Sequence, residues 1–412
     1  MTDYQDKFSK DVGSFLRSPV REIFKKTDLN SIYSFAGGYP CAETFPMEEI
    51  RDAMIEVLET YGSKSLQYGA TQGVPELREA LASRYKVPID RVQITSSSQQ
   101  GIDVCARIFV DPGDVIITSS PTYLGALQSF SSYRADVRGV ENREADVLGV
   151  ENRGSDVRGI ENGARSIEEF KHNYEKAINR AIFEGKKVKF IYMIPDFQNP
   201  SGESLSLEER KVLVELAEKY DFLIVEDSPY RELRYEGEHL PTIYSLSPDR
   251  VIHLGSFSKI IAPGFRLGWA IAHPEILDKI YVCKQALDLC PPIFNQYVIA
   301  ILMNNGVLDR NLLQTVNLYR SKRDLLLSLL EKYMPKGVTW THPDGGLFIF
   351  LTLPEGFDAI QFYDKALEAG VAYVAGTFFA PDGSKLNTMR LNFSFLSEDR
   401  MEEGIKLLAS LL

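Results

Sequence analysis

The sequence predicts an α/β protein: a large domain with a mostly parallel sheet between helices, followed by a smaller α+β domain. Two observations lead to this expectation. Between residues 72 and 320 the chain repeatedly shows a short apolar run, a polar loop rich in Gly, Pro and Ser, and then a helical pattern. From about Asn295 this alternation gives way to a long helical stretch. Strands that alternate with helices imply right-handed crossovers and hence a mostly parallel sheet.

Five short apolar runs have the composition of buried strands. They lie at residues 92–95, 115–118, 188–194, 222–225 and 251–254. Helices are expected from about Gln99 to Val110 and from Ser206, where Ser206 and Glu209 have the spacing of a capping box. Because ligands of open α/β sheets bind at the carboxyl ends of the strands, we expect the chemistry in the residues that follow these runs.

The C-terminal part predicts the second, smaller domain. A helical pattern runs from about Asn295 to Tyr333, strand-like runs follow at 347–351 and 390–393, and a final helix is expected over 401–411. The segment from Leu16 to Phe45 has too little apolar sequence to fold alone and should pack on the rest. We therefore divide the chain into an N-terminal segment (1–45), a large cofactor-binding domain (46–295) and a small domain (296–412).

Length and composition suit a globular enzyme of the cytoplasm. The 412 residues are 44% hydrophobic, and 46 Lys plus Arg against 57 Asp plus Glu give a formal charge of −11. This acidic balance argues against nucleic-acid or anionic-membrane partners. The polar first residues lack a signal-peptide pattern, and no run approaches the roughly 20 apolar residues of a membrane helix. Four scattered cysteines without a CxxC pair suit a reducing compartment.

The most specific motif follows the last of the five runs. Ser256-Phe-Ser258-Lys259 precedes Pro-Gly-Phe-Arg266-Leu-Gly. Arg266 and the two serines can hold a phosphate and leave the Lys259 amine for covalent chemistry. The string resembles the Schiff-base lysine motif of fold-type-I pyridoxal-phosphate enzymes, in particular the class I/II aminotransferases. The resemblance extends over nearly the whole chain, because the other motifs follow in the family order.

This resemblance implies pyridoxal 5′-phosphate as the cofactor and a large domain with a sheet of the seven-stranded type. The cofactor needs an amine, an anion near its ring nitrogen and donors to its ring oxygen. Asp227, after a strand, can pair with the ring nitrogen, and Tyr230 can donate to the ring oxygen. Asn199, in Asn-Pro-Ser-Gly, resembles the family's asparagine that also bonds this oxygen. Lys259, Asp227 and Tyr230 are therefore the candidate catalytic residues.

A second motif, Ser98-Gln99-Gln100, opens the helix after the first strand. Free N–H groups and the positive end of a helix dipole make such a loop a phosphate site. The motif resembles the family's Gly-Ser-Gln-Gln loop, with Ser97 in place of the usual glycine. Because a serine should avoid the strained positive φ that glycine accepts, we expect a slightly rearranged loop.

Four further residues take their roles from the same resemblance. Tyr123 looks like the aromatic residue that stacks on the cofactor ring. Tyr68 resembles the tyrosine that reaches the phosphate of the neighbouring subunit, which implies a homodimer with shared active sites. A buried core tyrosine is the alternative for both, and more so for Tyr68. Arg390 looks like the arginine that clamps the substrate α-carboxylate, a task that suits a bidentate guanidinium. Gly38 resembles the second glycine of a pair that lets the backbone approach the substrate, beside Asn199.

The motifs predict transfer of an amino group from an L-amino acid to a 2-oxo acid, with 2-oxoglutarate as the expected acceptor. The resemblance is strongest to aminotransferases acting on aromatic amino acids, kynurenine or 2-aminoadipate. Their mobile N-terminal segment covers the substrate, and residues 18–23 look like it. Arg21 is expected to reach a distal carboxylate from this lid, while a surface arginine on an amphipathic helix is equally open. A lyase or decarboxylase remains the alternative, since fold does not fix reaction type.

Two other classes of function are disfavoured. A regulator that joins this fold to a DNA-binding domain would carry a winged-helix segment, and only about 30 residues precede the motif at Phe35. The five histidines show no metal-ligand spacing, so no metal is expected, and His253 should be packed within a strand.

A ten-residue unit occurs three times in tandem, at residues 135–144, 145–154 and 155–164. One copy suffices as the link between two helices, so the other two amount to a 20-residue insertion. Each copy has two β-branched positions separated by glycine and then a turn-prone Asn. We expect turns or short edge strands at the rim of the large domain, peripheral to Lys259; a partner-binding flap is the alternative.

Overall fold

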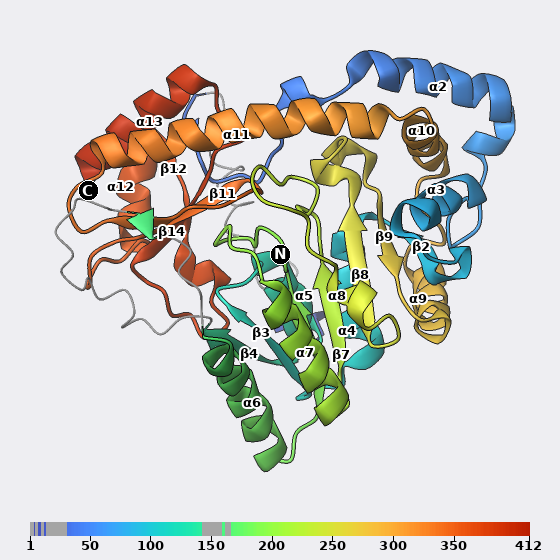
Figure 1. The fold of residues 1–412 in the computed structure, drawn as a ribbon, viewed down its shortest axis with the longest axis horizontal. Coiled ribbons are helices and arrows are strands. Elements are labelled where there is room, and N and C mark those ends of the chain that lie inside the picture. Colours follow the sequence, from blue (N-terminus) through green and yellow to red (C-terminus); the bar gives the residue numbers. More distant parts are fainter. Residues whose placement is uncertain (1–3, 5–6, 10–11, 14–30, 142–158, 161–165) are drawn as a thin grey trace.

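The computed structural model describes residues 4, 7–9, 12–13, 31–141, 159–160 and 166–412. Its larger sheet contains β2 (Val92–Thr95), β3 (Val115–Ser120), β4 (Asp136–Glu141), β6 (Val188–Met193), β7 (Leu223–Asp227), β8 (Val251–Ser256) and β9 (Gly268–Ile271) (Figure 1). The order across this sheet is β2-β9-β8-β7-β6-β3-β4. The five predicted strands are all present, and β9 is an addition.

The sheet is mostly parallel, as predicted. The neighbouring strands β4, β3, β6, β7 and β8 run parallel to one another. β9 lies between β8 and β2 and runs antiparallel to both. Every residue of β3, β8 and β9 is buried. These strands are buried along their whole length because helices cover both faces of the sheet.

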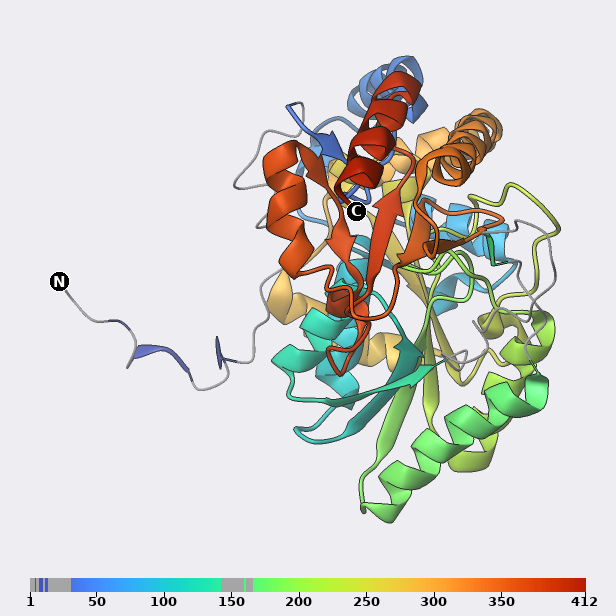
Figure 2. The same ribbon diagram turned by 90° about the vertical axis from the view of Figure 1, so that its left-hand side faces the viewer.

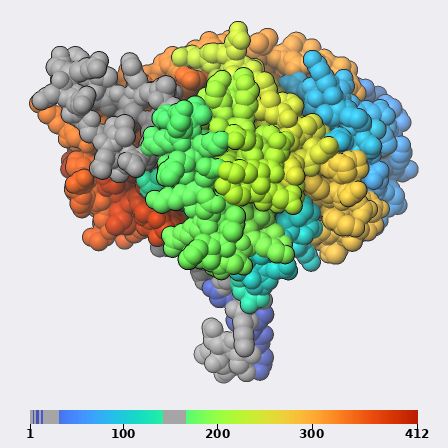
Figure 3. Space-filling view, turned by 60° about the horizontal axis from the view of Figure 1, so that its bottom comes forward, coloured from blue at the N-terminus to red at the C-terminus, as the bar shows by residue number. Residues whose placement is uncertain are grey.

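Helices form a layer on each face of the sheet. One layer contains α4 (Ser97–Phe109), α5 (Leu124–Ser132) and α9 (Pro274–Leu287), and the other contains α6 (Ile167–Phe183), α7 (Leu207–Tyr220) and α8 (Ile243–Leu246). In the space-filling view, α6 and α7 lie side by side in shades of green (Figure 3). The predicted capping box of α7 is confirmed, because the Ser206 side chain accepts from Glu209 N and the Glu209 carboxylate from Ser206 N.

A second, five-stranded sheet lies in the C-terminal part. It contains β5 (Gly159–Ile160), β10 (Thr339–Thr341), β11 (Phe348–Thr352), β13 (Val374–Ala375) and β14 (Thr388–Asn392), in the order β13-β14-β11-β10-β5. Figure 2 shows α12 (Gln361–Ala369) and α13 (Glu398–Leu411) beside these strands. β1 (Tyr33–Ser34) pairs in parallel with β12 (Val371–Ala372), which ties the early chain to the C-terminal part. The domain boundaries themselves stay a prediction.

Four further α-helices lie outside these layers. They are α2 (Met47–Tyr61), α3 (Pro75–Tyr85), α10 (Ile293–Asn304) and α11 (Val307–Tyr333). One of them, α11, contacts both α10 and α13. The long α11 runs across the molecule from α10 to α13 (Figure 1). None of the helices that the structure describes is long and apolar enough to cross a membrane.

The repeated unit contributes to both sheets. Its first copy forms β4, an edge strand of the larger sheet that pairs with β3, as expected of a short edge strand. Residues of the third copy form β5, which pairs with Trp340 and Thr341 of β10. The expectation that all copies lie at the rim of the large domain is therefore wrong for β5, because the open edge of β10 offers the same backbone pairing. The middle copy lies outside the described residues.

Candidate active site

Lys259 lies just after β8, at the end of a short 3-10 turn that spans Phe257–Lys259. Its amine donates a hydrogen bond to the Gly38 carbonyl oxygen at 2.7 Å. Burial, together with the positive charges of Arg390 and Arg266, lowers the pKa of Lys259 to about 8. A large fraction of this amine is therefore neutral near pH 8 and can act as a nucleophile or base.

Asp227 ends β7, the strand beside β8, and is 1% exposed. Its Oδ2 accepts a hydrogen bond from the Tyr192 hydroxyl at 2.8 Å. Its Oδ1 is buried and has no hydrogen-bond partner among the residues that the structure describes. Burial raises the pKa of this carboxyl to about 6, against the opposing effects of Tyr192, His253 and Ser98. A buried carboxylate oxygen without a partner suits a ligand cation.

Asn199 connects two other predicted residues. Its Nδ2 donates to the Tyr230 hydroxyl at 3.4 Å, and its Oδ1 accepts from Arg390 Nη1 at 2.7 Å. All three side chains are buried. Burial raises the pKa of Tyr230, so its hydroxyl remains a hydrogen-bond donor at neutral pH.

Arg390 lies in the middle of β14 and also donates to the Ala36 carbonyl oxygen. Its guanidinium is 4.2 Å from the ring centroid of Phe348 and 5.0 Å from that of Phe379. Burial lowers its pKa to about 10. Within the described ranges no carboxylate pairs with it, and its Nε is buried without a partner. A buried cation held between two rings and lacking a counter-ion suits the carboxylate of a ligand.

The turn from β2 into α4 meets the segment between β8 and β9 that carries Arg266. Arg266 Nη2 donates to the Ser97 hydroxyl at 2.8 Å, and the hydroxyls of Ser256 and Ser258 are 2.9 Å apart. Ser97 has a φ of 67°, so the expectation that this serine avoids the left-handed region is wrong. The bond to Arg266 and the close backbone at Gly268 hold it there, and a Cβ on Gly268 would lie 2.7 Å from the Ser97 carbonyl carbon.

The side chains of the two glutamines in this loop are bound by the protein itself. Gln99 Nε2 donates to Gly125 O and to Ser129 Oγ, and its Oε1 accepts from the Tyr123 hydroxyl at 3.1 Å. Gln100 bonds Ser96 N and Asp288. The loop can therefore contribute to an anion site through Ser98 and through the N–H groups of the first turn of α4.

The remaining predicted residues are Gly38, Tyr123, Tyr68 and Arg21, and the structure places the first two at the site. Gly38 contacts Lys259 as stated, and a Cβ there would lie 3.1 Å from Phe348 Cζ. Tyr68 is 79% exposed, so a core position is excluded within this chain. Tyr123 precedes α5 and bonds Gln99. Arg21 lies outside the described residues.

Sequence reasoning missed several contributors to the site. Tyr192, Asp288, Phe348 and Phe379 contact predicted residues but belong to no motif that we singled out. Alternation along β6 is the one signal that could have found Tyr192. Its strand partner is Val225, two residues before Asp227, so both side chains leave the same face of the sheet.

These observations can be set beside known proteins. The chain matches the family described as "Aminotransferase class I and II" over residues 34–408. The chain belongs to this family. It is an aminotransferase of the pyridoxal-phosphate-dependent type, as predicted.

Several relatives support this assignment. The aminotransferase is 42% identical to aromatic-amino-acid aminotransferase 1 of Thermococcus litoralis, over 99% of this chain and 94% of the relative. The kynurenine aminotransferase of Pyrococcus horikoshii, solved with PMP, kynurenine and KYA, is 41% identical with a TM-score of 0.89, over 99% and 97% of the two chains. The α-aminoadipate aminotransferase LysN of Thermus thermophilus, solved with N-(5′-phosphopyridoxyl)-L-leucine, is 33% identical with a TM-score of 0.87, over 100% and 98%.

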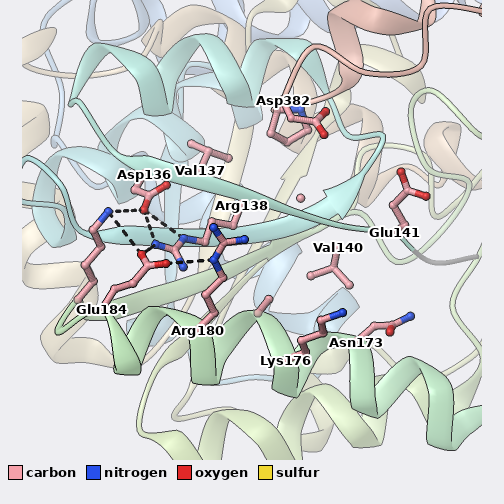
Figure 4. Close-up of a pocket in the computed structure, with 14 residues that line it drawn as sticks. Asp136, Val137, Arg138, Val140, Glu141, Asn173, Lys176, Arg180, Glu184 and Asp382 are labelled. Carbon is pink, nitrogen blue, oxygen red and sulfur yellow. Dashed lines mark hydrogen bonds and ion pairs between the residues drawn. The ribbon is translucent and has the colours of Figure 1, made fainter. Parts of the chain in front are cut away.

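A separate surface cleft of about 680 Å³ lies between β4 and α6 (Figure 4). Its charges are largely paired, since Arg138 bonds both Asp136 and Glu184, and Arg180 bonds Glu184. None of the predicted site residues lines it. Over the described ranges, no group of three or more His, Cys, Asp or Glu is placed to hold a metal ion.

Proposed function

We propose that this aminotransferase takes the amino group of aromatic or 2-aminoadipate-like L-amino acids and gives it to a 2-oxo acid, with 2-oxoglutarate as the acceptor. The observation that carries the proposal is one site with three groups left for a ligand: the Lys259 amine with its lowered pKa, Asp227 Oδ1 without a partner, and the buried Arg390 guanidinium without a counter-ion. These three groups would bind, in this order, an aldehyde, a ring cation and a carboxylate. The relatives named above act on aromatic amino acids, kynurenine and α-aminoadipate, which supports this donor class.

The site residues fit pyridoxal 5′-phosphate. Asp227 Oδ1 would hold the ring nitrogen, and Tyr230 with Asn199 would bond the ring oxygen. The phosphate would bind to the first turn of α4 and to the side chains of Ser98, Ser256, Ser258 and Arg266. Tyr123 would lie against the ring. When bound, this cofactor supplies an electron-withdrawing ring that stabilises negative charge on the substrate α-carbon.

Lys259 is the candidate for both covalent attachment and proton transfer. Its lowered pKa keeps part of the amine neutral. With the cofactor bound, Nζ would take the α-proton from the substrate and pass it to the cofactor. Asp227, held as a carboxylate, keeps a proton on the ring nitrogen opposite it. Its pKa of about 6 leaves most of this carboxyl ionised at pH 7.

Arg390 orients the substrate for this proton transfer. Donor amino acids and 2-oxo acids share an α-carboxylate, so one clamp serves both halves of a ping-pong reaction. Asn199 holds one side of the guanidinium, and the rings of Phe348 and Phe379 fix its plane. The remaining N–H groups are left for a bidentate carboxylate.

A panel of amino donors with 2-oxoglutarate tests the proposal against a lyase or decarboxylase. Transamination requires one glutamate formed for each donor consumed, without ammonia or carbon dioxide. We expect aromatic donors, kynurenine and 2-aminoadipate to be the best substrates. Stoichiometric release of ammonia or carbon dioxide would refute the proposed reaction.

The proposal includes a homodimer with shared sites. α2 leaves Met54, Ile55 and Leu58 exposed, and Leu66 and Tyr68 are exposed on the segment that follows. Exposed apolar side chains in such a group suit an interface with another chain. Tyr68 would then reach the phosphate in the partner's site. Sedimentation should give twice the chain mass, and Tyr68→Phe should weaken cofactor binding without dissociating the dimer.

Two expectations extend the proposal beyond the described site. Arg21 would reach the distal carboxylate of 2-oxoglutarate or of an acidic donor from a lid over the site. The cytoplasm is the proposed compartment, since all four cysteines are free and a reducing environment keeps them so.

A further inference from the structure

Tyr192, which belongs to none of the motifs described above, donates a hydrogen bond to Asp227. It lies in β6, is fully buried, and its hydroxyl donates to Asp227 Oδ2 at 2.8 Å. Burial beside Asp227 raises the pKa of Tyr192 well above its ordinary value. Its hydroxyl therefore stays protonated and acts as a permanent donor.

The position of the Tyr192 ring is fixed by its neighbours. Phe130 of α5 meets it edge to face, with ring centroids 5.4 Å apart and an interplanar angle of 77°. Tyr192 pairs with Thr118 in β3 and with Val225 in β7. Because alternate residues of a strand share a face, Tyr192 and Asp227 project from the same side of the sheet. The hydroxyl is thus held at one oxygen of the carboxylate.

Few other groups can assist this carboxylate. The titratable or hydroxyl groups that interact with Asp227 through charge or a hydrogen bond are Tyr192 from β6, His253 from β8, Ser98 and Cys105 from α4, and Tyr230. Burial raises the pKa of Cys105, so this thiol adds no charge. His253 lies with its Nδ1 3.2 Å from Glu226 Oε2, a carboxylate on the opposite face of β7.

We propose that Tyr192 is a positioning residue that directs Asp227 Oδ1 toward the ring nitrogen of the cofactor and stabilises the carboxylate form. The hydroxyl occupies Oδ2, so the unpartnered Oδ1 is the oxygen left for the ligand. This inference rests on the proposed role of Asp227. It assigns a function to the Tyr192 hydroxyl, whereas packing in the core would need only the ring.

Binding of pyridoxamine 5′-phosphate to the apoenzyme tests the proposal, because this form does not react with Lys259. Equilibrium dialysis from pH 5 to 9 should show weaker binding as Asp227 becomes protonated. Loss of a hydrogen bond to the charged form raises the pKa of a carboxyl. In Tyr192→Phe the fall in binding toward acid pH should therefore move up by about one pH unit, with binding about tenfold weaker at pH 5.

Tyr373→Phe is the matched control. Tyr373 is also fully buried, and its hydroxyl donates to the Ala359 carbonyl oxygen, away from Asp227. The Tyr373→Phe enzyme should keep the wild-type pH dependence of pyridoxamine 5′-phosphate binding. Its loss of stability in urea should be comparable to that of Tyr192→Phe. An unchanged pH dependence of binding in Tyr192→Phe would overturn the proposal. So would failure of Tyr192→Phe alone to fold, since Tyr192 would then be a packing residue.

A double-mutant cycle with Asp227→Asn distinguishes the role proposed for Tyr192 from the role of Asp227 on which it rests. Asp227→Asn should itself weaken binding, and Tyr192→Phe should add less than about twofold in that background. Full tenfold weakening in both backgrounds would overturn the role of Tyr192. Unchanged binding in Asp227→Asn would instead refute the assignment of Asp227.

Discussion

The amine of Lys259 donates a hydrogen bond to the carbonyl oxygen of Gly38, 221 residues away in sequence. This bond brings the early chain to the end of β8, so the site is completed by residues from both ends of the protein. β1 holds the same segment against β12, and the bond from Asn392 N to Phe35 O holds it against β14, which carries Arg390. The covalent and substrate-binding parts of the site are thereby linked through residues 33–38.

The lowered pKa of Lys259 predicts the pH dependence of cofactor attachment. The neutral amine is the reactive form, so the rate at which the apoenzyme takes up pyridoxal 5′-phosphate should rise with pH and level off above about pH 8. Stopped-flow absorbance measures this rate. Arg390→Met removes a nearby positive charge and should move the midpoint upward. A midpoint near the ordinary lysine value in wild type would contradict this account.

Arg390→Lys should lower kcat/KM about 100-fold for every amino donor, because a point charge replaces a bidentate fork in a buried site. Cofactor absorbance should be retained. Steady-state kinetics with an aromatic and an acidic donor provide the measurement. Arg180→Lys, at an exposed pair with Glu184 on α6, is the control and should change nothing. Equal kinetics for Arg390→Lys and wild type would exclude the carboxylate clamp.

Much of the site follows from the sequence because its residues come directly after buried strands. Asp227 and Lys259 are placed by β7 and β8, whose apolar runs are short and unambiguous. Tyr192 and Asp288 escape such reasoning, since their roles depend on which side chains meet across the sheet and between helices. The φ of Ser97 is equally a product of tertiary contacts, because Arg266 and Gly268 hold it in place.

The fold shows the same division. α2 carries an apolar stripe that includes Ala53, Met54, Val57 and Leu58, but only Ala53 and Val57 are buried, while Met54, Ile55 and Leu58 stay exposed. Packing within one chain therefore accounts for only part of this stripe, and the proposed interface with a second chain would cover the rest. β9 was missed because four residues, two of them Gly and Ala, give little strand signal.

Arg21→Ala should raise KM for dicarboxylic substrates and spare neutral ones, because only the former present a second carboxylate to a lid. The measurement compares KM for 2-aminoadipate and an aromatic donor at saturating 2-oxoglutarate, and then KM for 2-oxoglutarate. An equal effect on both donors, or none, would remove Arg21 from the substrate site.

Deletion of residues 145–164 should leave kcat and cofactor content within a few-fold of wild type, because β4 remains and none of the site residues is lost. This deletion removes β5 and so exposes the edge of β10. Deletion of 145–154 alone is the matched variant, since it retains the residues of β5. The longer deletion should therefore be the less stable of the two in urea. Loss of cofactor or of the dimer would show that the repeat belongs to the site or the interface.

The most direct test of the central claim is to locate the lysine that holds the cofactor. Borohydride reduction of the holoenzyme followed by peptide mass spectrometry should find the pyridoxyl group on Lys259. Lys284 is the informative competitor, because burial also lowers its pKa to about 8, although its amine bonds Thr71 O and Ile94 O. Lys259→Ala should give no adduct and lower kcat at least about 1,000-fold. An adduct on Lys284, or near wild-type turnover in Lys259→Ala, would contradict the account.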